Sequence, residues 1–312
     1  MKILITGAAG NLGSLLARHL LHQNIGQLRL MVFRRDVPDD LKIAGKTEIV
    51  RADLSRLATL PTAVKGVDVI VHFAGVLFKA NPERFLGTTN TIYFKNLVDV
   101  AKENGVRRII LISFPHVEGP TSVEKPARGR LDGNPISIHA KTRLEEEKYL
   151  FANAPEPLSL RVGMVYGRGI LMIDAARWLA RRRLLGIWRE RTQIHLISKD
   201  DFCTACAAAI TNQAASGIYH LGDEGNVSLQ EFLNLACRQW EAGRPWTMPL
   251  WLIYTAAELC ELCSKLTGSA SPLTRDFIDI GRVSYYGDTE RMRKELLPVL
   301  KYRTIADGIS TL

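Results

Sequence analysis

The sequence predicts an α/β fold in which helices cover a doubly wound parallel sheet, with a smaller α/β lobe in the second half of the chain. Three observations predict it. Short apolar runs alternate with longer helical patterns through residues 1–168. A glycine-rich turn directly follows the first of these runs, and the regular alternation ends near residue 169.

The strands of the first half are expected to be buried on both faces, because their apolar residues are consecutive and include many β-branched side chains. Their ranges are 2–6, 28–33, 47–50, 67–75, 107–113 and 158–163. Helices are expected between them at 10–23, 82–104 and 134–153. Asn134 and Pro135 look like the cap and the first residue of the last helix.

Residues 169–312 are predicted to form a smaller lobe built onto the sheet of residues 1–168, with some of its elements interleaved. The glycine-flanked run at 217–222 predicts a further strand. The segment 249–268 begins with a proline, is rich in apolar residues and predicts a helix. No internal repeat or low-complexity linker separates the two halves.

The composition is typical of a globular protein, with 46% hydrophobic and 23% charged residues in a chain of 312. No uninterrupted apolar run reaches the length of a membrane span. Strand-forming residues begin at Lys2, so no signal or transit peptide is expected. The expected location is the cytoplasm.

The net charge of +9 is concentrated in part in six arginines within residues 177–191. They indicate a solvated helix face, a site for an anionic substrate such as a nucleoside diphosphate, or contact with an acidic membrane surface. Nucleic acid is not expected as a partner, since no basic stripe interleaved with aromatic residues accompanies them.

Two CxxC pairs, Cys203 with Cys206 and Cys260 with Cys263, are also present. Both lie in helical patterns, where positions three apart share a face. The distance between the pairs exceeds that of a zinc ribbon. Reduced core cysteines are therefore expected, without a metal site or a disulfide.

The glycines of the turn lie between a strand and a helix, at a spacing that suits a dinucleotide. One glycine permits the tight turn, one lets the backbone approach a pyrophosphate, and one lets helix and strand pack closely. The phosphates then rest at the helix N-terminus, where free N–H groups and the helix dipole favour negative charge. The predicted site in this turn comprises Gly7, Ala9, Gly10, Asn11, Leu12 and Gly13.

The end of the second strand, Phe33-Arg34-Arg35-Asp36, predicts which dinucleotide binds. An enzyme that uses NAD commonly places a carboxylate here, on the ribose 2′-hydroxyl. Arg34 and Arg35 suit a 2′-phosphate instead, because a guanidinium binds phosphate through two parallel hydrogen bonds. NADP(H) is therefore expected, and NAD(H) is the alternative if Asp36 holds the ribose.

These residues resemble the extended short-chain dehydrogenase/reductase family, which includes nucleotide-sugar epimerases, dehydratases and 3β-hydroxysteroid dehydrogenase-like enzymes. The resemblance covers nearly the whole chain. Beyond the glycine spacing, it includes ADL (52–54), GVDVIVHFAG (66–75), NTIYFKNLVDVAKENGVRRIILIS (90–113), RVGMVYGRG (161–169), YYGDTERMRKELL (285–297) and ADG (306–308).

The resemblance implies a Rossmann fold that binds NAD(P) through residues 1–168, together with the family's chemistry on a small molecule. It implies that Lys141 binds the hydroxyls of the nicotinamide ribose and lowers the pKa of a nearby proton donor. The residues it assigns to the adenine are Asp53 and Leu54, and those it assigns to the ribose and nicotinamide side are Phe73, Ala74 and Gly75.

The chain departs from the family at the proton donor, which is the tyrosine of a YxxxK motif. In the segment NPISIHAK, Ser137 occupies the tyrosine position four residues before Lys141. In SFPHVEG, Phe114 occupies the place of the family's assisting hydroxyl. Ser113 is one residue earlier, where a strand directs it to the opposite face. The usual proton relay is therefore predicted to be absent from its usual position.

Other groups are candidates for the missing donor. His139 suits acid–base chemistry near neutrality. However, it lies about 200° around the helix from Ser137, so it contributes only if the helix begins later than Pro135. A packing histidine is the alternative. Ser137 is a weak donor or a substrate contact. Tyr166, just past the sixth strand, is a donor or a loop anchor.

Two classes of function remain open. One is an NAD(P)-dependent oxidoreductase with an unconventional proton path and a small-molecule substrate, or a nucleotide-sugar epimerase or dehydratase-like enzyme that uses the arginine cluster. The other is a non-redox protein that senses the dinucleotide or holds it as a structural group, as a regulator or assembly subunit would. The missing tyrosine favours the second class, and the presence of Lys141 disfavours it.

The apolar segment from Pro249 to Leu266, with Trp246, Trp251 and Tyr254 close by, bears on substrate and partner. It indicates a lipophilic ligand, a peripheral membrane surface or a homodimer contact. The resemblance also relates this region to family members that act on steroid-like or other hydrophobic molecules. A helix that covers the lobe of a monomer is the alternative.

Overall fold

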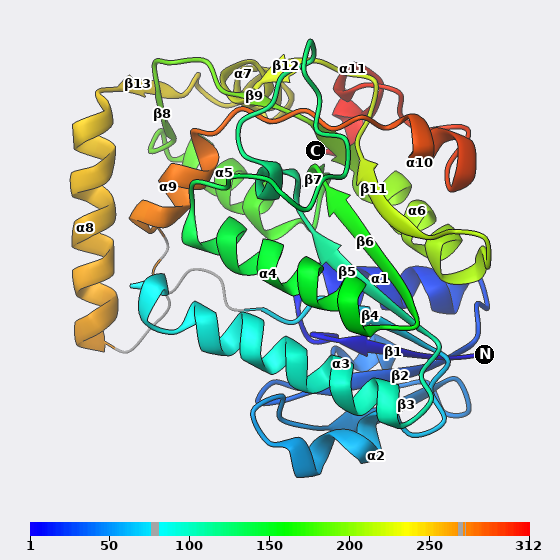
Figure 1. Ribbon diagram of the computed structural model, residues 1–312. Coiled ribbons are helices and arrows are strands. Elements are labelled where there is room, and N and C mark those ends of the chain that lie inside the picture. Colours follow the sequence, from blue (N-terminus) through cyan, green and yellow to red (C-terminus); the bar gives the residue numbers. More distant parts are fainter. Residues whose placement is uncertain (76–80, 268–270, 272) are drawn as a thin grey trace.

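The computed structural model describes residues 1–75, 81–267, 271 and 273–312. Gly268, the last residue of the helix predicted over 249–268, lies outside these ranges. Within them, seven parallel strands form one sheet, ordered β3-β2-β1-β4-β5-β6-β11 (Figure 1). The strands are β1 (Lys2–Thr6), β2 (Gln27–Val32), β3 (Thr47–Arg51), β4 (Val69–His72), β5 (Arg108–Ser113), β6 (Glu156–Val162) and β11 (Gly217–Leu221).

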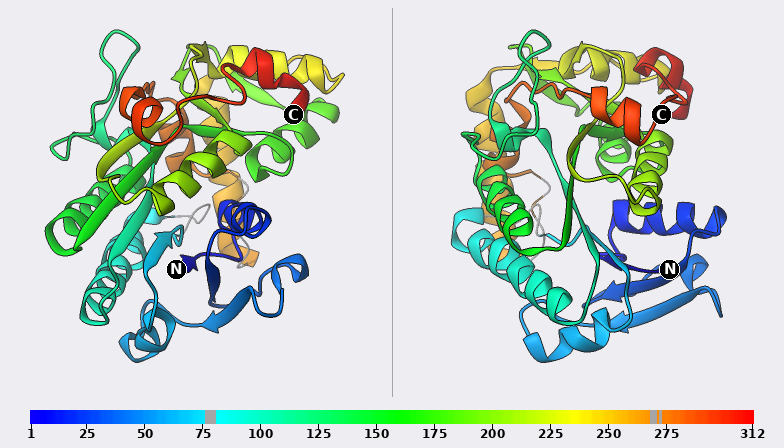
Figure 2. Two further views of the ribbon diagram at one scale, coloured as in Figure 1. Left: turned by 90° about the vertical axis from the view of Figure 1, so that its right-hand side faces the viewer. Right: turned by 45° about the vertical axis from the view of Figure 1, so that its right-hand side comes forward.

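Helices cover both faces of this sheet, so the doubly wound α/β fold is confirmed. Figure 2 shows α3 and α4 on one side of the strands and α1 on the other. The first layer contains α2 (Leu60–Val64), α3 (Tyr93–Glu103) and α4 (Ile138–Asn153), and the second contains α1 (Asn11–His22) and α6 (Lys199–Thr211). The short helix α2 was not among the predicted elements.

Burial on both faces explains the consecutive apolar residues of β1, β2, β4 and β5. The expected burial of the strand at 47–50 is wrong, because β3 is the edge strand and Ile49 is 39% exposed. In β1, Ile3 and Ile5 pack into the core on the α1 side, whereas Leu4 packs into a second core beneath α2 and α3. All three side chains are fully buried. A strand between two helical layers has no solvent face, so nothing in its sequence needs to alternate.

Two predicted helices differ from the observed ones. The segment over 82–104 consists of a 3₁₀ turn (Pro82–Arg84), a π-helical turn (Gly87–Ile92) and then α3. The helix predicted to begin at Pro135 begins at Ile138 instead.

The second half of the chain is interleaved with the first, as its strand β11 and helix α6 complete the main sheet and its outer layer. The remaining elements form the smaller lobe. They are β7 (Met164–Tyr166), α5 (Leu171–Arg181), β8 (Gly186–Trp188), β9 (Gln193–Ile194), β10 (Leu196–Ser198), β12 (Val227–Ser228), α7 (Leu229–Gln239), β13 (Trp246–Met248), α8 (Leu250–Thr267), α9 (Arg275–Gly281), α10 (Glu290–Glu295) and α11 (Ile305–Gly308).

The lobe lies beside the carboxyl edge of the sheet, with α9 between α8 and the first turn of α4 (Figure 1). Of the helices that the structure describes, none has the length and apolar character needed to cross a bilayer.

Candidate functional site

The glycine-rich turn joins β1 to α1 at the point where the strand order reverses. Gly7 has a positive φ of 67°, and its carbonyl accepts the Gly10 N–H at 2.8 Å. A Cβ on Gly13 would lie 2.5 Å from the Gly7 carbonyl oxygen, so helix and turn pack too closely for any side chain there. The first bond of α1 runs from Ser14 N–H to Gly10. The N–H groups of residues 11–13 therefore precede the helical ladder and remain available to a phosphate.

Asn11 links this turn to the smaller lobe. Its side-chain amide donates to the Gly169 carbonyl at 2.7 Å, and its oxygen accepts the Leu171 N–H at 3.0 Å. The Asn11 side chain is thus engaged in holding the two parts of the chain together. Within the predicted dinucleotide site, Asn11 contributes its backbone, and its neighbours Ala9 and Leu12 pack partly against the core.

The segment after β2 presents two arginines. Arg34 and Arg35 are both exposed, and the Arg34 guanidinium lies 5.1 Å from the centre of the Phe33 ring. The Asp36 carboxylate, in contrast, pairs with Lys42 at 3.2 Å and accepts the Val37 N–H. The bond from Lys42 lowers the pKa of Asp36. The carboxylate that would favour NAD is held by its own loop, while the arginines remain at the surface.

The predicted adenine segment is ordered by local hydrogen bonds. The Asp53 carboxylate accepts from the Ser55 N–H at 2.9 Å and from the Ser55 hydroxyl at 2.7 Å. The Leu54 carbonyl accepts from the Asn96 amide at 2.9 Å. Asp53 and Leu54 are consequently fixed at the end of β3, one strand beyond the two arginines.

β1 and β4 are tied together where Phe73, Ala74 and Gly75 leave the sheet. The Thr6 hydroxyl bonds the His72 ring at 2.9 Å and the Ala74 N–H at 3.4 Å. Burial, with a contribution from the Arg143 charge, lowers the pKa of His72 to about 3, so the ring is neutral. A Cβ on Gly7 would lie 3.0 Å from the Ala74 nitrogen. The two predicted cofactor segments therefore meet at the switch point of the sheet, where ligands bind in such folds.

Ser137 has a structural role that explains the later start of α4. It has extended backbone angles, and its hydroxyl accepts the Ala140 N–H at 3.2 Å, which makes it the N-cap. Serine is a strong cap, and Asn134 with Pro135 belongs to the chain that approaches the helix. The buried face of α4 carries His139 and Arg143, whereas Lys141 is exposed.

Lys141 is exposed and lines an outer hollow of about 640 Å³ with Thr91, Lys95 and Lys148. The structure does not bring it to Gly75. The cation near Gly75 is Arg143, whose Nη2 lies 3.3 Å from the position of a Cβ on that glycine. Arg143 was not among the predicted site residues.

His139 lies one turn before Arg143 on the same face and is buried. Its Nδ1 pairs with the carboxylate of Asp276, which comes from the first turn of α9 in the smaller lobe. Asp276 was also missed by sequence reasoning. The spacing of four between His139 and Arg143, together with the capping preference of Ser137, was the available signal for this pair.

The remaining donor candidates, Ser113 and Tyr166, are buried. The Ser113 hydroxyl, at the end of β5, is buried and has no hydrogen-bond partner among the described residues. Phe114 packs on His116, which packs on Tyr285. Tyr166 is fully buried, and its ring lies against Gly308 in α11. Burial raises the pKa of Tyr166, and its packing against Gly308 favours the loop anchor over the donor.

Comparison with known proteins identifies the first half of the chain. A family model described as NAD(P)H-binding matches residues 7–151. Residues 7–151 form an NAD(P)-binding Rossmann domain. The uronate dehydrogenase of Pseudomonas putida is 29% identical over 57% of this chain and 66% of its own length. The ceramide reductase of Caulobacter vibrioides is 26% identical over 71% of this chain and 64% of its own. This chain thus spans less than two thirds of the length of these relatives.

Solved structures extend the likeness of the fold to the whole chain. A double mutant of dTDP-glucose 4,6-dehydratase from Streptomyces venezuelae, with NAD bound, has a TM-score of 0.79 at 18% identity and covers 100% of this chain and 95% of its own. A UDP-glucuronic acid 4-epimerase from Bacillus cereus, in complex with NAD, has a TM-score of 0.76 at 18% identity and covers 100% and 97%. At this identity they show that the smaller lobe shares the neighbours' fold as well.

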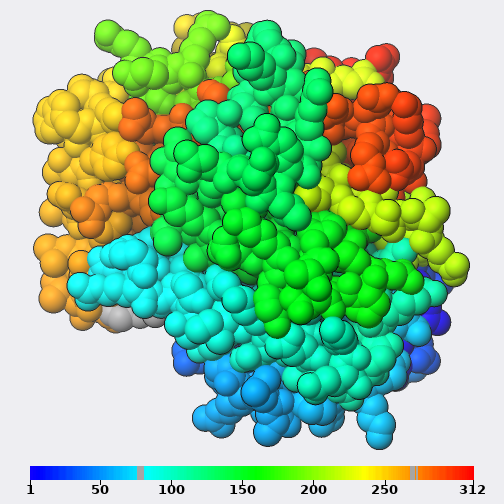
Figure 3. Space-filling model, viewed as in Figure 1, coloured from blue at the N-terminus to red at the C-terminus, as the bar shows by residue number. Residues whose placement is uncertain are grey.

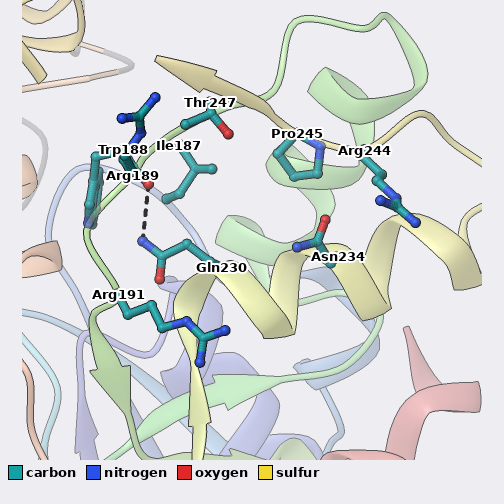
Figure 4. Close-up of a pocket in the computed structure, with 9 residues that line it drawn as sticks. All are labelled: Ile187, Trp188, Arg189, Arg191, Gln230, Asn234, Arg244, Pro245 and Thr247. Atoms are coloured by element: carbon teal, nitrogen blue, oxygen red, sulfur yellow. Dashed lines mark hydrogen bonds between the residues drawn. The ribbon is translucent and has the colours of Figure 1, made fainter. Parts of the chain in front are cut away.

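A pocket of about 460 Å³ lies in the smaller lobe, apart from the NAD(P)-binding domain. Arg189, Arg191 and Arg244 line it with Gln230 of α7, whose amide donates to the Trp188 carbonyl at 3.2 Å (Figure 4). The lining is taken entirely from residues 187–247. Two arginines of the predicted cluster therefore belong to a concave basic site.

α8 presents an apolar strip to the outside. Trp251 is 68% exposed and Leu266 80%, and Leu259 and Leu262 are exposed between them. In the space-filling view, α8 forms one flank of the molecule (Figure 3). Trp246, just before α8, donates its indole N–H to the Arg183 carbonyl at 2.8 Å, so Arg183, which follows α5, lies near the start of α8.

The two cysteine pairs lie on different helices. Cys203 and Cys206 are buried in α6, as expected of core cysteines. The same prediction is wrong for the pair in α8, where Cys260 is only partly buried and Cys263 is exposed. Among the described residues, no group of three or more histidine, cysteine or carboxylate side chains is placed to hold a metal ion.

Proposed function

We propose that this protein is an NAD(P)-dependent oxidoreductase that acts on a small carbonyl or hydroxyl compound. The observation that carries the proposal is the glycine-rich turn at the switch point, within a segment that matches an NAD(P)H-binding family model. Two of the relatives are named as uronate dehydrogenases and one as a ceramide reductase, all of which are oxidoreductases by name.

The bound nicotinamide would supply or accept the hydride, and the protein would orient it. The N–H groups at the start of α1 would hold the diphosphate, and residues 73–75 would line the nicotinamide ribose. Gly7 and Gly13 keep this cradle free of side chains, because a Cβ on either would contact backbone within 3.0 Å. The residues present therefore fit a dinucleotide.

NADP(H) is the proposed form of the cofactor. Arg34 and Arg35 are exposed at the end of β2, and Lys42 holds the competing carboxylate of Asp36. In titrations of nicotinamide fluorescence, Arg34→Ala is expected to weaken NADPH binding by about ten-fold and NADH binding little, since a charge-assisted contact to the 2′-phosphate is lost. Equal weakening of both would contradict the preference.

Turnover separates the oxidoreductase from a protein that only senses or stores the dinucleotide. NADPH consumption is to be measured with uronic acids on one side and long-chain ketones and N-acyl amino ketones on the other. Turnover of either class supports the proposal. Tight NADPH binding with no consumption across both classes would favour the non-redox alternative.

A lipophilic substrate, presented by a membrane, is the proposed class. The Caulobacter vibrioides relative is named a ceramide reductase, and ceramide is a lipid. α8, which carries the apolar strip, is about 27 Å long. Arg183 lies near its start, because the Arg183 carbonyl accepts from the indole of Trp246 just before the helix. Apolar residues next to arginines complement an anionic bilayer, and we propose such a bilayer as the occupant of the strip.

Vesicle flotation tests this surface. The protein is expected to float with phosphatidylglycerol vesicles more than with phosphatidylcholine vesicles, and the double substitution Trp251→Ser with Leu262→Ser is expected to abolish flotation. Val299→Ser is the matched control, because Val299 is 79% exposed and lies far along the chain from α8. No flotation of the unmodified protein would overturn the proposal, and a dimer that the double substitution dissociates would assign the strip to a second copy.

A nucleotide-sugar enzyme is the second candidate, and the arginine-lined pocket is the observation that favours it. The structural neighbours include enzymes solved with nucleotides or sugar nucleotides. Calorimetry with UDP-glucuronic acid is expected to show binding that Arg244→Ala weakens if this candidate holds. The pocket takes its lining from the smaller lobe alone, which is why the oxidoreductase is preferred.

A further inference from the structure

The pocket of the smaller lobe has more cations than the neighbouring carboxylates neutralise. Arg191 pairs at 3.2 Å with Glu231, in the first turn of α7. Arg189 and Arg244 are exposed, and neither guanidinium makes an ion pair or a hydrogen bond with any described residue. Two unpaired guanidinium groups in the lining of one pocket of about 460 Å³ suit an anion that supplies the missing negative charge.

The loop 189–192, which carries two of the arginines, is held in place from α7. The Gln230 amide donates to the carbonyls of Trp188 at 3.2 Å and Glu190 at 2.6 Å (Figure 4). The Gln230 oxygen accepts the Thr192 N–H at 3.1 Å, and the Trp188 indole donates to the Thr192 hydroxyl at 2.9 Å. Because the loop is already ordered, an anion that binds to it loses less free energy to conformational entropy.

The pocket lies at the start of α8. Thr247, which lines it, belongs to β13, and α8 begins shortly after this strand, at Leu250. Trp246 is 60% exposed and Trp251 is 68% exposed, so two indoles flank the junction. Tryptophan is enriched at the level of lipid headgroups, where one side of the ring is apolar and the other polar. An apolar helix that starts beside a cationic pocket complements both the chains and the headgroup of an anionic lipid.

A nucleotide sugar is a poorer match to this pocket. Its sugar must reach the nicotinamide, whereas the lining comes only from residues 187–247 of the smaller lobe. Its base would need an open aromatic face on which to stack. Trp188 offers none, because it is 7% exposed and a Cβ on Gly281 would lie 3.0 Å from its ring. A lipid headgroup has neither requirement, since only its phosphate must be held near α8.

We propose that this pocket binds the phosphate of an anionic phospholipid whose acyl chains lie against α8. The inference rests on the proposed function, in which a bilayer covers the apolar strip of α8. Arg189 and Arg244 hold the phosphate through charge-assisted hydrogen bonds. Asn234 also lines the pocket, and its side-chain amide, which has no hydrogen-bond partner among the described residues, donates a further bond. The strip provides affinity for the membrane, and the pocket selects the lipid.

The first test separates recognition of a phosphate from general attraction to negative charge. Phosphatidylcholine vesicles are prepared with phosphatidylglycerol or with oleate, matched in surface potential, and flotation measures the bound fraction. The unmodified protein is expected to bind the phosphatidylglycerol vesicles about ten-fold more tightly. The double substitution Arg189→Ala with Arg244→Ala is expected to remove this preference. Equal binding of the unmodified protein to both kinds of vesicle would overturn the pocket as a phosphate site.

Matched variants test whether the preference belongs to the pocket. Arg244→Ala and its control Arg238→Ala remove the same charge, but Arg238 is exposed on α7 outside the pocket lining. The preference is expected to fall in Arg244→Ala and to persist in Arg238→Ala. Asn234→Leu leaves the charge unchanged and should also weaken the preference. Equal loss in Arg244→Ala and Arg238→Ala would assign the effect to net charge and overturn the inference.

Calorimetry distinguishes a lipid from a soluble phosphate in the same pocket. Monomeric dihexanoyl-phosphatidylglycerol is expected to bind, and Arg244→Ala to weaken that binding, whereas inorganic phosphate and UDP-glucuronic acid should bind more weakly. Binding of a soluble phosphate that depends on Arg244, without binding of the lipid, would overturn the inference. NADPH binding by the unmodified protein is measured in parallel. Its absence would count against the proposed function, whereas NADPH binding without a lipid preference would count against the pocket alone.

Discussion

The glycine-rich turn and the start of α4 are two short segments of the Rossmann half of the chain. They are determined by different kinds of interaction. The turn is determined by backbone geometry within seven residues. A Cβ on Gly7 or on Gly13 would contact backbone atoms at 3.0 Å or less, so both positions require glycine. The start of α4 is determined by a cap and a contact with α9, and a buried ion pair further along holds the helix to β6. A local rule therefore identifies the first correctly, and the second depends on long-range contacts.

The largest expected effect is on the turn. Gly13→Ala would place a Cβ 2.5 Å from the Gly7 carbonyl oxygen, so α1 must shift from the turn that holds the diphosphate. NADPH binding is expected to fall by about two orders of magnitude, and the free energy of unfolding by about 1–3 kcal/mol. Fluorescence titration and urea unfolding measure the two.

Gly243→Ala is the matched control, because nothing lies within 4 Å of a Cβ at that position. It should bind NADPH as the unmodified protein does. Normal NADPH binding by Gly13→Ala would show that diphosphate binding does not depend on this close packing. The turn would then not be determined by backbone geometry alone.

The second effect is on the ion pair that holds α4 to the sheet. Arg161 of β6 is fully buried and contacts Glu147 of α4 at 2.6 Å and the Glu118 carboxylate. Arg161→Met would leave two buried carboxylates without their cation, which costs about 3–5 kcal/mol of folding free energy. Urea unfolding is the measurement.

A double substitution sharpens this result. Adding Glu147→Gln to Arg161→Met removes one of the uncompensated charges and should restore part of the stability. If Arg161→Met alone is neutral, α4 is held by its apolar contacts and the comparison with the turn weakens.

The fold could be predicted from the sequence because its determinants are local. Consecutive apolar runs of five or six residues can be buried only between two helical layers, and the glycine spacing specifies one strand–turn–helix unit. The sequence does not show that the Asp36 carboxylate is paired with Lys42, because Lys42 follows a separate short turn. Arg143 and Asp276 were missed for a related reason. Pro135 suggested an earlier helix start, and α9 is more than 120 residues away in sequence.

Acid sensitivity is the third expectation. Burial alone would raise the pKa of Glu118, but the His220 ring, 3.3 Å away, and the Arg161 charge outweigh it and lower that pKa to about 2. A carboxyl with a depressed folded-state pKa stabilises the protein above its ordinary pKa. This contribution is expected to be lost as the pH falls from about 4.5 towards 2. Unfolding curves between these values measure it, and Glu118→Gln should flatten the dependence.

The smallest expected effect tests whether Ser137 caps α4 or belongs to the substrate site. Ser137→Ala removes the hydroxyl that caps the Ala140 N–H, and is expected to cost about 1 kcal/mol of unfolding free energy. Ser137→Asp retains a capping oxygen and should restore that stability, although it cannot donate a proton at neutral pH. NADPH binding and any turnover should be unchanged in Ser137→Asp, because a cap has no contact with the reacting groups. Loss of turnover with normal stability in Ser137→Asp would instead place Ser137 at the substrate, and would return Lys141 to the site as its partner one turn along the helix.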